Sequence, residues 1–441
     1  MEASEERLEA LDLNQQAVML LKSGNIADAK ERLERAIELD PMLMENYKNY
    51  GDVYMAEQDY KEAKNLYKKA LLIDKRGELY FLYGNACFMA DDVHEGLENY
   101  NLALSNGYDS EEMLFFMGMA YEHLNDESMA LRYFQKACIK NPSRPDFIVK
   151  KIMTLLNLGM EEEAEESIRE LIKTAPELYD GYHLRTQMLI RRKDYTAATA
   201  SAKEASDKFP EDADLMYDYA QSVALSGDYK KAYQLVEQAK SMKYFEDAKR
   251  NFTLLEAQIA AEDQDVDRAI RCCGMCIDME KEGVFDGEAR FMMMNLQLTK
   301  PDFEAALVQA QALIDSQKED SYYYAALYYR PFCMKQLGRM DEVQKYLKEA
   351  NSYYRLCTLK HPEAADAYLY RAMCLKDMEE YDKALEMIEF VDKITNGIAE
   401  VHTLRAEIYR ALGKEAQAEE EMQKAYQEKP ELRNVFEKEE K

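Results

Sequence analysis

The sequence predicts an all-α protein built as a solenoid of about twelve stacked helix–turn–helix repeats. A pattern of small, aromatic and leucine residues returns about every 34 residues along nearly the whole chain. The chain has 441 residues, too many for one globular core but natural for a stack in which each repeat contacts only its neighbours. Only 9 prolines and 16 glycines occur, several of them at expected helix ends, which favours helices throughout.

Residues 111–142 carry the pattern most completely. Gly118 shares one face of a first helix with Leu114 and Tyr121, where it allows a neighbouring helix to approach closely. A second helix carries Phe134 as a large residue between two alanines. One helix pair cannot bury both stripes alone, so the repeats must stack. The complete pattern is Leu114, Met117, Gly118, Tyr121, Ala130, Phe134, Ala137 and Pro142.

This pattern resembles the tetratricopeptide repeat, a helix–turn–helix unit of about 34 residues. The tryptophan usual in the family's first helix is absent, and Tyr, Leu or Met stands there instead. The resemblance implies a right-handed superhelix in which the first helices of successive repeats line a concave groove. Repeats are expected to begin near residues 10, 44, 77, 111, 145, 179, 213, 250, 287, 324, 365 and 399.

The regularity of the pattern divides the chain into three segments of one continuous solenoid. Residues 1–245 are expected to form seven regular repeats with an N-terminal cap, and residues 246–364 three looser and longer repeats. Residues 365–441 are expected to form two further repeats and a C-terminal cap. The middle segment is interpreted either as drift in the superhelical pitch or as a hinge or separate contact surface.

The charge of the chain limits its possible partners. The formal net charge is −28, which argues against nucleic acid and anionic membrane surfaces because both require a basic protein surface. A partner with basic segments would be attracted electrostatically. The alternative interpretation is that acidic helix surfaces only keep a long repeat protein soluble.

The N-terminal sequence and the hydropathy predict where the protein resides. Residues 1–16 are polar and acidic, without the apolar core of a signal peptide, and no apolar run approaches the length of a membrane-spanning helix. A cytoplasmic protein without membrane insertion, whose 8 cysteines are reduced, is therefore expected.

The predicted binding site is the groove of repeats 3 to 6. The groove positions carry aromatic and apolar side chains, with acidic residues at the edges. If these apolar side chains are exposed, they need a partner or a cover. The alternative is that they are buried against adjacent first helices. The residues of this first group are Phe81, Leu82, Phe88, Phe115, Phe116 and Met119. A second group places an amide at the ninth position of a repeat, where it could pair with an extended peptide backbone. Its members are Asn85, Gln187, Gln221, Gln258 and Asn295.

Other family functions are disfavoured by particular residues. Some members of this family bind the C-terminal carboxylate of chaperones with a clamp of Lys, Asn and Arg side chains. The resemblance allows the clamp positions of the family to be compared with the corresponding positions of this chain. Asn14 and Val18 replace the expected Lys and Asn, and Glu78 and Leu82 stand where Lys and Arg are needed. Because an acidic residue repels a carboxylate, binding of a chaperone tail is not expected.

The sequence contains no catalytic or cofactor-binding motif. Cys272, Cys273 and Cys276 form a CCxxC cluster, but no second cysteine pair or nearby histidine completes a metal site, so we interpret them as buried core residues. No phosphate-binding loop, nucleophile elbow or dinucleotide fingerprint is present. We therefore expect no enzyme activity, no cofactor and no metal.

Three functions remain compatible with these observations. The first is a non-catalytic scaffold or adaptor that binds a protein or peptide with basic or apolar segments in its concave groove. The second is a regulatory sensor whose superhelix closes around a peptide. The third is an architectural subunit that fixes spacing within a larger assembly or associates with itself.

Overall fold

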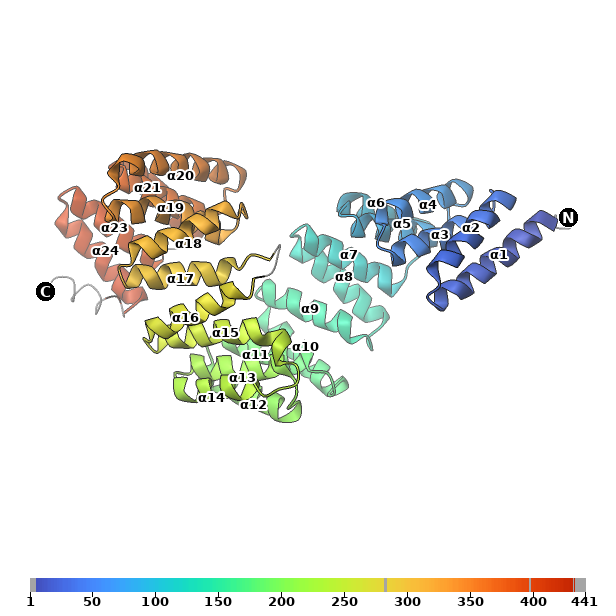
Figure 1. Cartoon of the computed structure of the whole chain (residues 1–441), viewed down its shortest axis with the longest axis horizontal. Coiled ribbons are helices and arrows are strands. Elements are labelled where there is room, and N and C mark those ends of the chain that lie inside the picture. Colours follow the sequence, from blue (N-terminus) through green and yellow to red (C-terminus); the bar gives the residue numbers. More distant parts are fainter. Residues whose placement is uncertain (1–4, 281–283, 396–397, 431, 433–441) are drawn as a thin grey trace. The chain divides into compact units, whose positions relative to one another are not determined.

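The computed structural model describes residues 5–280, 284–395, 398–430 and 432. Over these residues the regular structure consists of 24 α-helices and no strand. The chain divides into two compact units, Met1–Pro210 and Glu211–Lys441. Within each unit the helices pack as successive pairs (Figure 1). Most of the predicted C-terminal cap, residues 431–441, and residues 1–4 of the N-terminal cap lie outside the described residues.

The N-terminal unit contains repeats 1 to 6, and the odd-numbered helix is the first helix of each repeat. These helices are α1 (Glu5–Lys22), α2 (Ile26–Leu39), α3 (Met44–Ala56), α4 (Tyr60–Ile73), α5 (Gly77–Met89), α6 (Val93–Ser105), α7 (Glu111–His123), α8 (Glu127–Lys140), α9 (Pro145–Asn157), α10 (Glu161–Thr174), α11 (Asp180–Arg191) and α12 (Tyr195–Lys208).

The C-terminal unit contains repeats 7 to 12 in the same alternation. Its helices are α13 (Ala213–Leu225), α14 (Tyr229–Ala239), α15 (Phe245–Glu262), α16 (Val266–Asp278), α17 (Gly287–Thr299), α18 (Phe303–Asp315), α19 (Ser321–Gln336), α20 (Met340–Lys360), α21 (Ala365–Asp377), α22 (Tyr381–Thr395), α23 (Ala399–Ala411) and α24 (Glu415–Glu428).

The all-α class and the twelve repeats predicted from the sequence are confirmed. The first helices α3, α5 and α7 begin at Met44, Gly77 and Glu111, the predicted starts of their repeats. The largest differences occur at α1 and α15, which begin at Glu5 and Phe245 instead of near residues 10 and 250, followed by α19, which begins at Ser321 instead of near 324. In the same segment α20 extends over 21 residues. The three-part division of the chain and the hand of the superhelix stay predictions.

The turn inside a repeat follows from its sequence. In repeat 4, Asn125 adopts a left-handed conformation with φ of 58°, which asparagine tolerates better than most residues. The next residue, Asp126, caps α8 by accepting a hydrogen bond of 3.0 Å from the amide of Met129. Gly159 and Gly227, with φ of 71° and 87°, occupy the left-handed position in two other repeats. The turn of repeat 4 thus ends at the residue that caps its second helix.

A glycine of the first helix packs against an aromatic ring of the second helix in three successive repeats. A Cβ atom added to Gly118 would lie 2.5 Å from the Cε1 atom of Phe134, and one added to Gly84 would lie 2.7 Å from the same atom of Tyr100. Both rings are fully buried. Repeat 2 repeats the arrangement with Gly51 and Tyr67, so the glycine predicted to allow close approach does so.

Among the residues that the structure describes, no helix combines the length and the apolar character that a membrane crossing requires.

Candidate functional site

The first helices of repeats 3 to 5 carry a row of phenylalanine rings, which we call the first-helix surface. The ring centroid of Phe116 in α7 lies 6.2 Å from that of Phe81 and 6.4 Å from that of Phe88, both in α5. The same ring lies 6.3 Å from Phe115, which stacks on Phe147 of α9 at 4.6 Å. Because these contacts pass from repeat to repeat, the row fixes three neighbouring first helices against one another.

The expected solvent exposure of this row is wrong for Phe81, which is only 5% exposed. Its ring stacks on Tyr108 at 5.2 Å, in the loop between α6 and α7, and packs with Val93 and Tyr100. The loop covers Phe81, and helix periodicity alone cannot predict such a cover. The other predicted members are half-buried, namely Leu82, Phe88, Phe115, Phe116 and Met119. Their role in binding stays a prediction.

Phe81 therefore belongs to the core, and its truncation should destabilise the N-terminal unit. We expect Phe81→Ala to lower the free energy of unfolding by about 3 kcal/mol, through lost burial and the cavity left behind. Urea unfolding followed by circular dichroism measures the change. Phe88→Ala, at a half-buried ring, should cost less. Equal losses for the two variants would contradict the difference in burial.

The acidic residues at the edges of the first-helix surface are paired with basic residues. The nitrogen–oxygen distances are 3.9 Å for Lys48–Glu78, 3.8 Å for Arg144–Glu112 and 2.8 Å for Lys150–Glu122. Each pair joins two neighbouring repeats, so much of the expected negative charge is compensated within the chain. An apolar partner therefore fits this surface better than a basic one. Met153 of α9, which is 41% exposed, extends its apolar area.

The predicted amide positions differ in their surroundings. The Oδ1 atom of Asn85 accepts a hydrogen bond of 2.8 Å from the hydroxyl of Tyr100. The NH₂ group of Asn85 is therefore the part of this side chain that can bond to a peptide. In the C-terminal unit the buried Oε1 atom of Gln221 has no hydrogen-bond partner among the described residues. Gln187, Gln258 and Asn295 are half-buried in α11, α15 and α17. Their contact with a peptide stays a prediction.

Asparagines at the position of the chaperone clamp bond to one another. Asn14 of α1 donates to Asn46 of α3 at 2.8 Å and accepts from Asn49 at 2.8 Å. Asn14 and Asn46 are buried. These hydrogen bonds join repeats 1 and 2, while the buried Nδ2 atom of Asn46 has no hydrogen-bond partner among the described residues.

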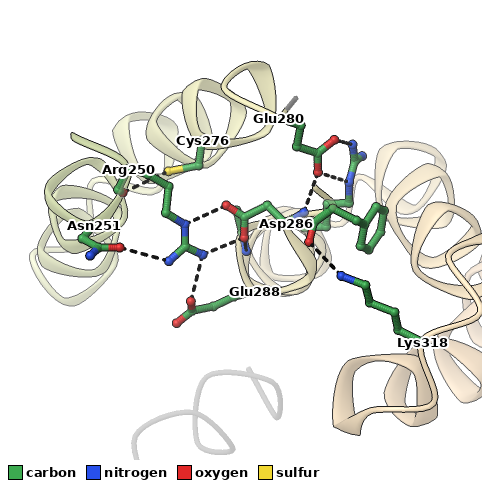
Figure 2. Close-up of polar contacts among 10 residues, drawn as sticks. Arg250, Asn251, Cys276, Glu280, Asp286, Glu288 and Lys318 are labelled. Carbon is green, nitrogen blue, oxygen red and sulfur yellow. Dashed lines mark hydrogen bonds and ion pairs between the residues drawn. The ribbon is translucent and has the colours of Figure 1, made fainter. Parts of the chain in front are cut away.

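A charged cluster that the sequence analysis missed joins α15 to α17 (Figure 2). Arg250 of α15 donates two hydrogen bonds to Asp286, at 2.9 and 2.7 Å, and a third of 2.9 Å to Glu288. Asp286 also caps α17 by accepting from the amide of Ala289 at 3.1 Å. Burial would raise the pKa of Asp286, but the guanidinium of Arg250 lowers it below its usual value.

This cluster acts as a clamp between repeats 8 and 9. Its bidentate geometry resembles that of strong arginine–carboxylate pairs, and Asp286 is buried. Arg250 and Asp286 stand about one repeat apart in the sequence, and this spacing could have indicated an ion pair between neighbouring repeats. No property of either residue alone predicts the pair.

The CCxxC cluster is buried in α16, as predicted. Cys272 and Cys273 pack with Ala257 and Leu296 from neighbouring first helices. Burial raises the pKa of the Cys272, Cys273 and Cys276 thiols to about 11, 12 and 11. The three thiols are therefore protonated near neutral pH, which suits apolar packing.

Each unit is thus a stack of α-helix pairs, which defines an α-helical repeat protein. In repeats 2 to 4 a glycine of the first helix packs against a ring of the second helix. Two family models of the tetratricopeptide repeat match the chain. One matches residues 20–93 and 189–248, and the other residues 111–138 and 399–432. The chain is a tetratricopeptide repeat protein, and the helix pairs between the matched segments continue the alternation of first and second helices.

Known proteins resemble the chain at low identity. Anaphase-promoting complex subunit 3 of Schizosaccharomyces pombe is 22% identical over 152 residues, which are 34% of this chain and 23% of that protein. The chain thus matches less than a quarter of that relative. The structure of yeast Tom70 has a TM-score of 0.48 at 16% identity, covering 98% of this chain and 100% of Tom70. The Cut9 and Hcn1 complex has a TM-score of 0.43 at 14% identity, covering 97% and 94%.

Proposed function

We propose that the chain is a non-catalytic scaffold that binds an apolar segment of a partner protein on its first-helix surface. The observation that carries this proposal is the row of half-buried Phe88, Phe115 and Phe116, continued by Met119 and Met153. Aromatic and methionine side chains are enriched where proteins bind one another, because they supply large contact areas that adapt to a partner. The paired charges at the edges leave an apolar centre with a polar rim, the usual composition of an interface.

The proposal is tested by placing charge in this apolar centre. Met119→Glu combined with Met153→Glu should reduce partner capture at least about tenfold, because an unpaired carboxylate would be buried on binding. The measurement is quantitative mass spectrometry of proteins that co-purify with the full chain. Circular dichroism should show unchanged helix content, since Met153 is exposed and Met119 half-buried.

A matched control variant carries the same change on another surface. Leu72 of α4 and Leu102 of α6 are exposed on second helices, so Leu72→Glu combined with Leu102→Glu should leave the set of captured proteins unchanged. Equal loss with this control would indicate a general effect of added charge. Unchanged capture with the methionine variant would place the partner elsewhere on the chain.

A second candidate function is that of a subunit in a large assembly. It is favoured by the similarity to a protein named as a subunit of the anaphase-promoting complex. Size-exclusion chromatography of a native extract distinguishes the two functions. A subunit elutes entirely at the size of an assembly, whereas an adaptor elutes partly as the free chain of 51.3 kDa.

A further inference from the structure

A second surface of the N-terminal unit, away from the first-helix surface, contains a cleft of about 520 Å³. It is lined by side chains of α8, α9 and α10, and we call it the α8–α10 cleft. Its apolar lining includes Ile148 and Leu155 of α9 and Ile139 of α8, which is 80% exposed. The volume lies within the range of binding pockets, and an isoleucine exposed this far at its edge offers an apolar contact to a ligand.

One face of α10 borders this cleft with three carboxylates. Glu163, Glu166 and Glu170 are spaced three and four residues apart, so they lie on the same side of the helix. All three are exposed, and none forms an ion pair with a described residue. By contrast, Glu161 and Glu165 on the same helix bind Arg192 at 2.7 and 2.8 Å. The negative charge beside the cleft is therefore uncompensated, unlike that of the first-helix surface.

A basic residue also lines the cleft and must be included in its charge. Lys151 of α9 is half-buried and has no ion pair with a described residue. Its charge offsets one of the three carboxylates, so the lining remains negative. A cationic ligand is favoured over an anionic one.

The hydroxyl of a buried residue in the cleft gives an independent indication of a ligand. Ser167 lines the cleft and is only 7% exposed as a residue, and its hydroxyl makes no hydrogen bond with any described group. Hydroxyls of nearby helices bond to the carbonyl four residues earlier, as Thr154 does at 2.9 Å and Thr174 at 2.9 Å. Because this hydroxyl lies in the lining of the cleft, it is available to a ligand that accepts or donates a hydrogen bond.

We propose that the α8–α10 cleft docks a basic segment of a partner protein, with an aliphatic or aromatic anchor beside lysine or arginine. The anchor contacts Ile139 and Ile148, the cationic groups pair with the carboxylates of α10, and the segment's backbone bonds the hydroxyl of Ser167. A free polyamine would supply the charge but not the anchor. This site is separate from the first-helix surface, so the proposal does not depend on the function proposed there.

Cys138, which lines the cleft, provides a built-in reporter. It is half-buried, whereas the other seven of the 8 cysteines are buried. Its alkylation by N-ethylmaleimide in the full chain can therefore be followed by mass spectrometry at a pH of about 8. The probe is a pool of hexapeptides with Leu, Ile or Phe at the two central positions and Lys or Arg at the outer ones. We expect this pool to slow alkylation of Cys138 about fivefold or more, with the protection weakening as salt is raised.

Variants connect the protection to the carboxylates. E163Q/E166Q/E170Q should lose it, because the cationic groups of the peptide no longer find their partners. The matched control E9Q/E31Q/E98Q removes the same charge from exposed positions on α1, α2 and α6 and should retain it. Alkylation rates without peptide should agree between the unmodified chain and E9Q/E31Q/E98Q, and E163Q/E166Q/E170Q should react equally fast or faster, because the charge of Glu170 adds to burial in raising the pKa of the Cys138 thiol. Protection is therefore taken as the ratio of the rates with and without peptide in each variant.

Several results would overturn the proposal. Equal protection by a pool with Asp and Glu at the outer positions would exclude charge recognition. Equal protection by spermidine would indicate a general cation site, and protection retained in E163Q/E166Q/E170Q would place the contact elsewhere. Absence of protection by the basic pool would show that the cleft does not dock such a segment. None of these results bears on the variants that test the first-helix surface.

Discussion

Replacing Gly118 with alanine should destabilise repeat 4 by about 2 kcal/mol, although alanine is the better helix former. The added Cβ atom would lie 2.5 Å from the Cε1 atom and 2.6 Å from the Cδ1 atom of Phe134, far inside van der Waals contact. Phe134 is fully buried, so its ring cannot move aside without disturbing its neighbours. Hydrogen exchange in α7 and α8 of the full chain measures the local loss of stability.

Two further variants separate overpacking from the intrinsic effect of alanine. Gly274 lies in α16, where an added Cβ atom would have no neighbour within 4 Å, so Gly274→Ala should be neutral or stabilising by up to about 1 kcal/mol. Phe134→Leu replaces the aromatic ring with a smaller aliphatic side chain and should make Gly118→Ala less harmful in the double variant. Equal effects of the two glycine substitutions would contradict the packing seen in repeat 4.

The sequence predicts this packing because it depends on local spacing. Gly118 and Phe134 stand at fixed positions of a repeating pattern, and stacking of identical helix pairs leaves little choice for where their side chains meet. The same reasoning fails for Phe81, whose burial depends on Tyr108 in a loop outside the pattern. Repeat periodicity therefore predicts contacts between helices better than it predicts which residues a loop covers.

The candidate sites were less predictable because they depend on pairing between repeats. The acidic residues beside the first-helix surface and those of α10 look alike in the sequence. Only the structure distinguishes Glu122, which binds Lys150 at 2.8 Å, from Glu166, which has no ion pair with a described residue. A net charge of −28 gives the average potential of the chain but not its local distribution. We therefore propose a basic partner for the α8–α10 cleft and an apolar one for the first-helix surface.

The last repeat should lose stability in acid through a single carboxylate. Glu421 of α24 has a side chain only 8% exposed, and its oxygens lie 2.8 Å from Arg405, 2.8 Å from Lys424 and 2.6 Å from His402. Burial alone would raise the pKa of Glu421. Hydrogen bonds from Lys424, His402 and Arg405 outweigh that effect and lower its pKa to about 2.

The direction of the pH effect follows from the sign of this shift. Because the folded-state pKa of Glu421 lies below its ordinary value of about 4.3, the folded state favours the ionised carboxylate. The contribution, on the order of 3 kcal/mol, is fully present above the unfolded-state pKa. It is lost as the pH falls from about 5 towards 2, where the carboxylate becomes protonated in the folded state too.

Glu421→Gln removes this pH dependence and should also destabilise repeat 12 at neutral pH, because the mostly buried Arg405 loses one of its two carboxylate partners and keeps only Asp392. Hydrogen-exchange protection of α24, corrected for intrinsic exchange rates, should fall between neutral pH and about 3 in the unmodified chain and fall less in the variant. Glu407→Gln breaks an exposed pair with Lys376 and should leave the acid response unchanged. Parallel pH profiles for the unmodified chain and Glu421→Gln would mean that other carboxylates govern the acid response of repeat 12.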